Sequence, residues 1–189
     1  MSKFTDAPFE IVTKPEAAKR QLATAIRLCL AGGDAVSIRT LACAAHEILT
    51  VLVATKGGRS LILDNPLYSA DKKKGVRRGF KGTYNFFKHA DRDAGALLRF
   101  RPLLVEWIIA DAVVMYRRAT GHSFPEAAVY MLYFFTTYES EFGDLPLAVE
   151  MRKQVAEMGE SPRTREDFHL ILLREQPNDT VDPRGPKGK

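Results

Sequence analysis

The sequence has few of the features that mark secreted, membrane-spanning and zinc-binding proteins. Only two of its 189 residues are cysteines, Cys29 and Cys43, and they form no Cys-x-x-Cys pair. Such sparse cysteine argues against a disulfide framework and is typical of a reduced cytoplasmic protein. No apolar run approaches the roughly 18–20 residues of a membrane span, and the acidic N-terminal residues are unlike a secretory signal. We therefore expect a cytoplasmic protein with no membrane partner.

The sequence motifs of the common cofactor and hydrolase sites are also missing. It contains no glycine-rich dinucleotide fingerprint, Walker sequence, His-Glu-x-x-His pair or nucleophile elbow. The alternation His89-x-Asp91-x-Asp93 offers an imidazole and two carboxylates, a set that suits Mg²⁺ or Mn²⁺ better than Zn²⁺. No second cluster supplies the remaining ligands, so the sequence predicts neither a cofactor nor a metal site.

The positive charge of the chain is concentrated in one segment. Residues 59–101 hold eleven Lys or Arg against four acidic residues, a net charge of +7, whereas the rest of the chain, with 17 basic and 19 acidic residues, has a net charge of −2. Clustered positive charge attracts polyanions through long-range steering and counterion release. RNA or DNA is therefore the first partner to consider. A charged run of this kind also arises as a solvated face that keeps a protein in solution.

Helical periodicity accounts for most of the sequence. Thr13 and Glu16 flank Pro15 at a predicted helix start, Ser37 is the predicted start of the second helix, and Gly121 is a predicted helix end. The remaining predicted helices cover 74–89, 103–120, 123–141, 146–158 and 163–174, with a short extended piece at 97–100. These features predict an all-α fold: a single-domain bundle of about six or seven helices over residues 13–175, with an N-terminal arm over 1–12 and a disordered tail over 176–189.

The predicted helix over 74–89 is amphipathic. Val76, Phe80 and Tyr84 fall on one side, and the basic side chains fall on the other. The candidate polyanion-binding residues are Lys72, Lys73, Lys74, Arg77, Arg78, Lys81 and Lys88.

Two pairs of residues suggest acid–base chemistry at a phosphate. Asn85 and His89 are i,i+4 neighbours on one predicted helix face, where an imidazole near neutral pH can move a proton in RNA cleavage. The same two residues are also favoured at helix C-termini, and capping would explain them without a site. The second pair is Arg39 and His46, two turns apart on a predicted helix; around them the sequence is nonpolar, which favours a structural histidine.

One buried carboxylate needs a partner. Asp111 lies amid apolar residues of the predicted helix over 103–120, and burying an unpaired carboxylate there costs several kcal/mol. Its candidate partners are His46, His89 and the basic residues of 72–101. If these groups form one site, His46, His89, Asp111 and Arg78 should converge on one cleft. A structural tether between two helices is the alternative.

Two resemblances add to this reading. Residues 15–93, through Gln21–Ile26, Gly33–Ile38 and the Asn85–Asp93 segment, resemble an uncharacterised family of small bacterial all-helical proteins, which implies a helical fold and a bacterial origin but no activity. The spacing Arg39–six residues–His46 is similar to the pattern of HEPN-type helical ribonucleases. That resemblance implies acid–base chemistry at His46 and phosphate stabilisation by Arg39.

Three functions are consistent with these observations. The first is a non-enzymatic helical module that binds nucleic acid or another polyanion through the basic segment over 72–101, and this is our expectation. The second is a metal-independent ribonuclease that uses His89 or His46. The third is a protein-binding or self-associating helical protein, a homo-oligomer in the simplest case.

Overall fold

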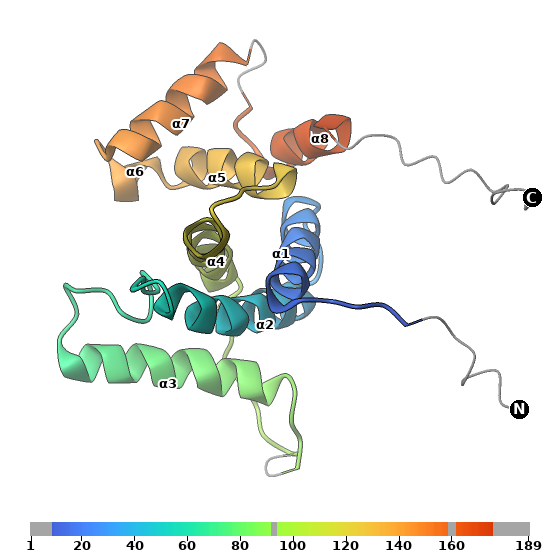
Figure 1. The fold of residues 1–189 in the computed structure, drawn as a ribbon, viewed down its shortest axis with the longest axis vertical. Helices are drawn as coiled ribbons and strands as arrows, with labels where there is room; N and C mark the ends of the chain where they lie inside the picture. The colour runs from blue at the N-terminus through green and yellow to red at the C-terminus, as the bar shows by residue number, and fades with distance from the viewer. Residues whose placement is uncertain (1–8, 92–93, 159–161, 176–189) are drawn as a thin grey trace, which may run out of the picture. The chain divides into compact units, whose positions relative to one another are not determined.

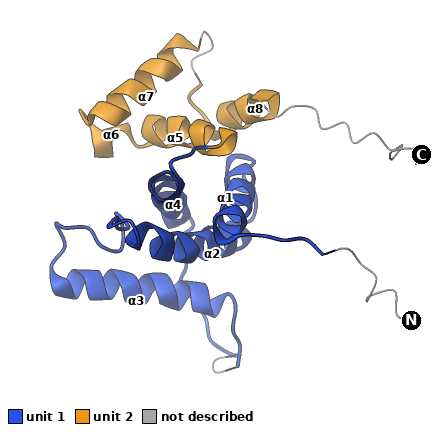
Figure 2. Cartoon of the chain, in the orientation of Figure 1, with its two compact units in different colours: residues 1–123 blue, residues 124–189 orange. Residues whose placement is uncertain are grey.

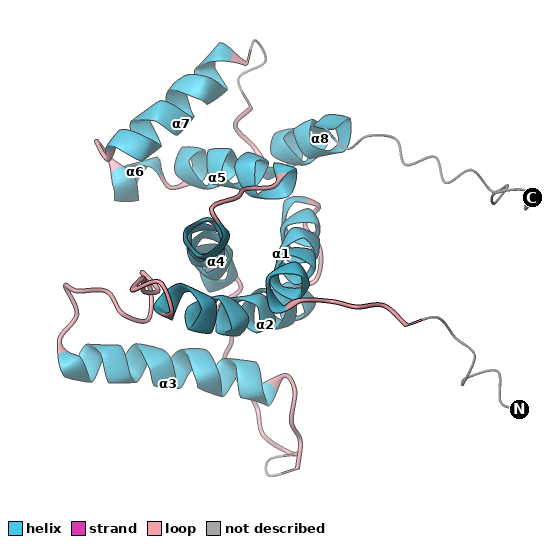
Figure 3. Ribbon diagram, viewed as in Figure 1, coloured by secondary structure: helices cyan, strands magenta, loops and turns pink. Residues whose placement is uncertain are grey.

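The structure is a computed structural model that describes residues 9–91, 94–158 and 162–175. These residues form eight α-helices and no β-strand (Figures 1 and 3), which confirms the predicted all-helical class. The helices are α1 (Lys14–Leu30), α2 (Ala35–Ala54), α3 (Ala70–Phe86), α4 (Leu104–Thr120), α5 (Pro125–Thr137), α6 (Glu139–Phe142), α7 (Pro146–Glu157) and α8 (Arg165–Glu175).

The chain divides into two compact units (Figure 2). Unit 1 covers residues 1–123 and contains α1 to α4, and unit 2 covers residues 124–189 and contains α5 to α8. The single bundle over 13–175 stays a prediction. The predicted tail over 176–189 and most of the predicted arm over 1–12 lie outside the described residues.

Local capping explains where several helices begin and end. The Thr13 hydroxyl accepts a hydrogen bond from the Glu16 amide at 3.3 Å, so Thr13 is the N-cap of α1 as the sequence predicts. Gly121 ends α4 with a φ of 78°, a left-handed conformation that glycine adopts without a steric penalty.

Some helix boundaries differ from the prediction for identifiable reasons. Asp34, not Ser37, caps α2, because its carboxylate accepts the Ser37 amide at 2.7 Å. The Ser69 hydroxyl accepts the Lys72 amide at 3.3 Å, and α3 therefore starts at Ala70, earlier than expected. The helix predicted over 123–141 is interrupted at Tyr138, which separates α5 from α6. Residues 97–100 are irregular.

The core of unit 1 is built around α2, which packs against α1 and α4. Leu22 and Ile26 of α1, Leu49 of α2 and Ile109 of α4 are each fully buried. α3 packs on α2, with Phe80 against Arg39 and His46 of α2, and the two buried residues of α3 are Phe80 and Tyr84. The rest of α3 therefore stays accessible to a partner.

One helix is longer and more apolar than the sequence analysis predicts. Among the described residues, α2 alone is long and apolar enough to cross a membrane, with a mean hydropathy of 1.5 over its most apolar window. The same length and composition occur in signal sequences and in core helices of soluble proteins. Here α2 packs against two other helices, and both Arg39 and His46 are buried on it.

In unit 2, α5 packs against α7 and α8. Its aromatic side chains form a connected cluster: Tyr130 contacts Tyr133 and Phe134, and Tyr133 contacts Phe168 of α8 in an edge-to-face arrangement. Each of these four residues is at most 3% exposed. They form the apolar core of unit 2.

Candidate functional site

Three basic residues form a continuous exposed row along α3. Lys74, Arg78 and Lys81 occur at i, i+4 and i+7, a spacing that places them on one face of a helix, and all three are exposed. No described carboxylate lies within ion-pair distance of any of them. We call these residues the α3 row. Their charges are directed into solvent, so a polyanion can approach them without first displacing an acidic partner.

Three of the other four predicted polyanion-binding residues contact a carboxylate or an aromatic ring. Arg77 forms an ion pair with Asp64. The Lys72 ammonium lies 4.3 Å from the ring centroid of Tyr68, and the Lys88 ammonium lies 3.4 Å from that of Tyr84. Such cation–π contacts leave the charge in place but fix its position. Lys73 is partly buried.

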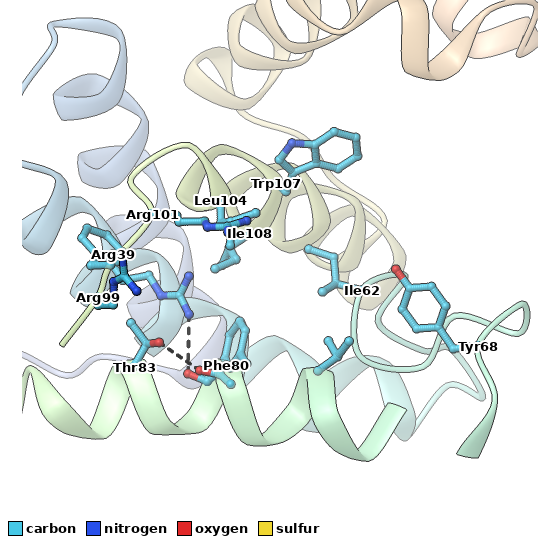
Figure 4. Close-up of a pocket in the computed structure, with 13 residues that line it drawn as sticks. Arg39, Ile62, Tyr68, Phe80, Thr83, Arg99, Arg101, Leu104, Trp107 and Ile108 are labelled. Atoms are coloured by element: carbon cyan, nitrogen blue, oxygen red, sulfur yellow. Dashed lines mark hydrogen bonds between the residues drawn. The ribbon is translucent and has the colours of Figure 1, made fainter. Parts of the chain in front are cut away.

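A cavity of about 470 Å³ lies within unit 1 (Figure 4). Its lining residues on α3 include Phe80 and Thr83, which the helical spacing places on the opposite face of α3 from the exposed row. Its walls come from α2, α3, α4 and the loops that precede α3 and α4. We call it the arginine pocket, because Arg39, Arg99 and Arg101 line it. Ile62, Tyr68 and Trp107 also line it.

Arg39 is the buried member of the three arginines, at 4% exposure. Its Nη2 donates to the Phe80 carbonyl oxygen at 3.5 Å, and its guanidinium carbon lies 5.1 Å from the Phe80 ring centroid. Its Nε is buried without a hydrogen-bond partner. Burial lowers the pKa of Arg39, and the neighbouring Cys43 thiol opposes that effect. The guanidinium is thus under-satisfied for a group with five N–H donors.

Arg99 and Arg101 come from the loop before α4 and are both exposed. No described carboxylate lies within ion-pair distance of either residue. In Figure 4 the side chains of all three arginines lie toward one end of the pocket, whereas Ile62, Tyr68 and Trp107 lie toward the other. The pocket therefore has a cationic end and an apolar, aromatic end.

A second polar cluster, in the core of unit 1, joins α2 to α4. His46 Nε2 lies 2.9 Å from Asp111 Oδ2. The same carboxylate accepts the Ser60 hydroxyl at 2.5 Å, the Leu61 amide at 2.8 Å and the Ile62 amide at 3.4 Å. His46, Ser60 and Asp111 are at most 3% exposed. We call this cluster the clamp. It ties α2 to α4, as expected if Asp111 is a structural tether, and it also holds the loop after α2.

The clamp has consequences for the ribonuclease hypothesis. Burial acts to raise the pKa of Asp111, but the hydrogen bonds from His46, Ser60 and the Leu61 amide outweigh it and lower that pKa. His46 is 0% exposed, and its ring also lies 4.8 Å from that of Phe80. A substrate phosphate cannot reach the imidazole while the clamp is closed.

The second acid–base pair lies on the surface, away from the clamp. Asn85 is partly buried and His89 is exposed, just past the end of α3. The Asn85 carbonyl oxygen accepts the backbone amides of Lys88 and His89, so the backbone itself closes this helix end. Of the four groups predicted to share a cleft, His46 and Asp111 meet, while His89 and Arg78 are exposed outside the clamp.

The described residues contain no group of three or more His, Cys, Asp or Glu side chains close enough to hold a metal ion. Asp93, the second carboxylate of the His89–Asp91–Asp93 alternation, lies outside the described residues.

The sequence does not identify Ser60 as a partner of Asp111, nor does it indicate that Arg99 and Arg101 line one pocket with Arg39. Ser60 is separated from Asp111 by 51 residues, and such pairings leave no periodic signal. A signal did exist for the pocket: Arg39 is the one arginine of the mostly apolar helix α2, and a buried guanidinium calls for an anion.

No protein-family model matches the chain, no curated protein matches it, and no solved structure matches it. The resemblances to the bacterial helical family and to HEPN-type ribonucleases therefore gain no support.

Proposed function

We propose that this protein is a helical module that binds nucleic acid through α3, with the α3 row as its principal contact to phosphates. The observation that carries the proposal is the exposed row of three cations, Lys74, Arg78 and Lys81, without acidic partners. Arg77 borders the row, while Lys72 near the start of α3 and Lys88 just past its end add to the positive charge of this helix. The module is cytoplasmic in this proposal.

The dimensions of α3 suit a polyanion with closely spaced charges. A 17-residue helix is about 25 Å long, and duplex DNA carries one negative charge per roughly 1.7 Å of its axis. Several phosphates therefore face the row at once. Contacts from flexible lysines and arginines to phosphates carry no base information, so binding is independent of sequence.

The burial of His46 favours this non-enzymatic function over a ribonuclease that uses His46. Cleavage of RNA requires an imidazole within hydrogen-bond reach of the 2′-hydroxyl or the leaving oxygen. His46 meets neither condition with its Nε2 bonded to Asp111 and 0% of its surface exposed.

The experiment is fluorescence anisotropy with labelled single-stranded RNA and double-stranded DNA of random sequence, at salt concentrations from about 50 to 200 mM. We expect binding at low salt. The logarithm of the binding constant should fall linearly with the logarithm of the salt concentration, because binding releases counterions. Binding that is absent at low salt, or that does not change with salt, would contradict the proposal.

A further inference from the structure

The arginine pocket contains a buried cation that lacks an anion. Arg39 is 4% exposed, its Nε has no hydrogen-bond partner, and its Nη2 makes only a long contact, 3.5 Å, to a backbone carbonyl oxygen. Charged groups removed from water are normally paired or fully hydrogen-bonded. Arg39 also lines the cavity, so an anion bound there can supply the counter-charge that the guanidinium lacks.

The charge around the pocket is of one sign. Arg39, Arg99 and Arg101 line it, and none of the described residues that line it is acidic. A second cavity of similar size in unit 1, about 460 Å³, is bordered by Asp64, which already pairs with Arg77 there. The two cavities therefore differ in what they can accept. Three guanidinium groups at one end suit a phosphate, whose oxygens accept paired N–H donors.

The opposite end of the pocket is shaped for an apolar, planar group. Trp107 of α4, Tyr68 of the loop before α3 and Ile62 line that end, and Figure 4 places them away from the arginines. Aromatic side chains bind planar rings by stacking, in a manner that tolerates different bases. A volume of about 470 Å³ falls in the range of small-molecule sites, roughly 300–1,000 Å³.

We propose that the arginine pocket binds a mononucleotide, with the phosphate between Arg39, Arg99 and Arg101 and the base against Trp107 and Tyr68. This site is separate from the α3 row and does not depend on nucleic-acid binding there. Arg39 supplies the buried, fixed contact, and the two loop arginines close over the phosphate from the exposed side. The protein thus holds a small anionic ligand beside its basic helix.

The test is isothermal titration calorimetry of the full chain with the four common nucleoside monophosphates, their nucleosides and inorganic phosphate. We expect at least one monophosphate to bind about tenfold or more tightly than its nucleoside and than phosphate alone, because only the monophosphate occupies both ends of the pocket. If no monophosphate binds at up to about 10 mM, or if phosphate alone binds as tightly, the proposal is wrong.

Matched variants separate this site from the α3 row. Arg99→Gln with Arg101→Gln removes two exposed charges and should weaken monophosphate binding by about tenfold or more, while nucleic-acid binding persists. Lys74→Gln with Arg78→Gln should leave monophosphate affinity within about twofold of the unsubstituted chain. The pocket assignment would be overturned if the Arg99/Arg101 variant kept the monophosphate affinity of the unsubstituted chain, or if the Lys74/Arg78 variant lost that affinity. Because each variant is measured with both ligands, failure of one proposal is distinguished from failure of the other.

Discussion

His46 Nε2 donates a hydrogen bond to Asp111 Oδ2 at 2.9 Å, and this contact joins α2 to α4 inside unit 1. Asp111 also accepts the Ser60 hydroxyl and the Leu61 amide, so one carboxylate holds two helices and the loop that follows α2. That loop leads to Tyr68 and α3, and the clamp therefore supports the elements that carry both proposed binding surfaces.

Asp111→Asn should destabilise the protein by about 3 kcal/mol or more, since an amide places a donor where the carboxylate accepts from several donors. Urea unfolding followed by circular dichroism measures the change. Asp64→Asn is the matched control, because its ion pair with Arg77 is near the surface and is worth at most about 1 kcal/mol. Equal effects of the two substitutions would show that the clamp contributes no more than a surface pair.

The clamp also predicts how stability depends on pH. Hydrogen bonds lower the pKa of folded Asp111 despite its burial, relative to an unfolded value of about 3.9. The stabilisation is therefore fully present above that unfolded value and is lost as the pH falls through the lower folded value. Titration of the Asp111 carboxyl carbon by NMR should give a midpoint below about 3.9. A midpoint above it would refute the lowered pKa.

Both cysteines should be unreactive in the native protein. Burial raises the pKa of the Cys43 thiol to about 11, and Cys29 is 4% exposed. Since the thiolate is the reactive form, iodoacetamide near pH 8 should label neither residue until the protein is unfolded in guanidinium. Mass spectrometry counts the modified thiols. Rapid labelling of Cys43 under native conditions would mean that the core of unit 1 opens readily.

Two glycines of α3 offer a way to stabilise this helix without touching its charges. A Cβ added at Gly75 or Gly82 meets no atom within 4 Å, so alanine fits at either position. Each substitution should stabilise the protein by up to about 1 kcal/mol, through higher helix propensity and a less flexible unfolded chain. Gly121→Ala is the contrasting case, because its φ of 78° disfavours alanine. Thermal unfolding should rank the variants accordingly; a loss of stability at Gly75 would contradict the exposed, regular helix described here.

The parts of the fold that follow from neighbouring residues could be predicted from sequence. Thr13 and Gly121 mark helix ends through local capping, and the apolar periodicity between them predicts the main helices of unit 1. Asp111 could be predicted to need a partner, because a carboxylate on an apolar helix face is costly when unpaired. His46 is among the partners that the sequence predicts for it, and the structure shows this contact.

The parts that depend on distant residues could not be predicted. Ser60 reaches Asp111 across 51 residues, and Arg39 is separated from Arg99 and Arg101 by a whole helix and two loops. A count of charges in the sequence also gives the same weight to all seven candidate polyanion-binding residues. It cannot show that Arg77 is paired with Asp64 while Lys74 has no such partner.

The most direct test of the proposed function compares two triple variants with equal loss of charge. Lys74→Gln, Arg78→Gln and Lys81→Gln remove the α3 row, whereas Lys14→Gln, Lys56→Gln and Lys153→Gln remove three lysines that lie elsewhere on the exposed surface. Anisotropy titrations measure the slope of log affinity against log salt. Loss of the row should reduce the magnitude of that slope by about 2 to 3 and weaken binding, while the control variant keeps the original slope. An unchanged slope without the row, or an equal reduction in the control, would contradict binding through α3.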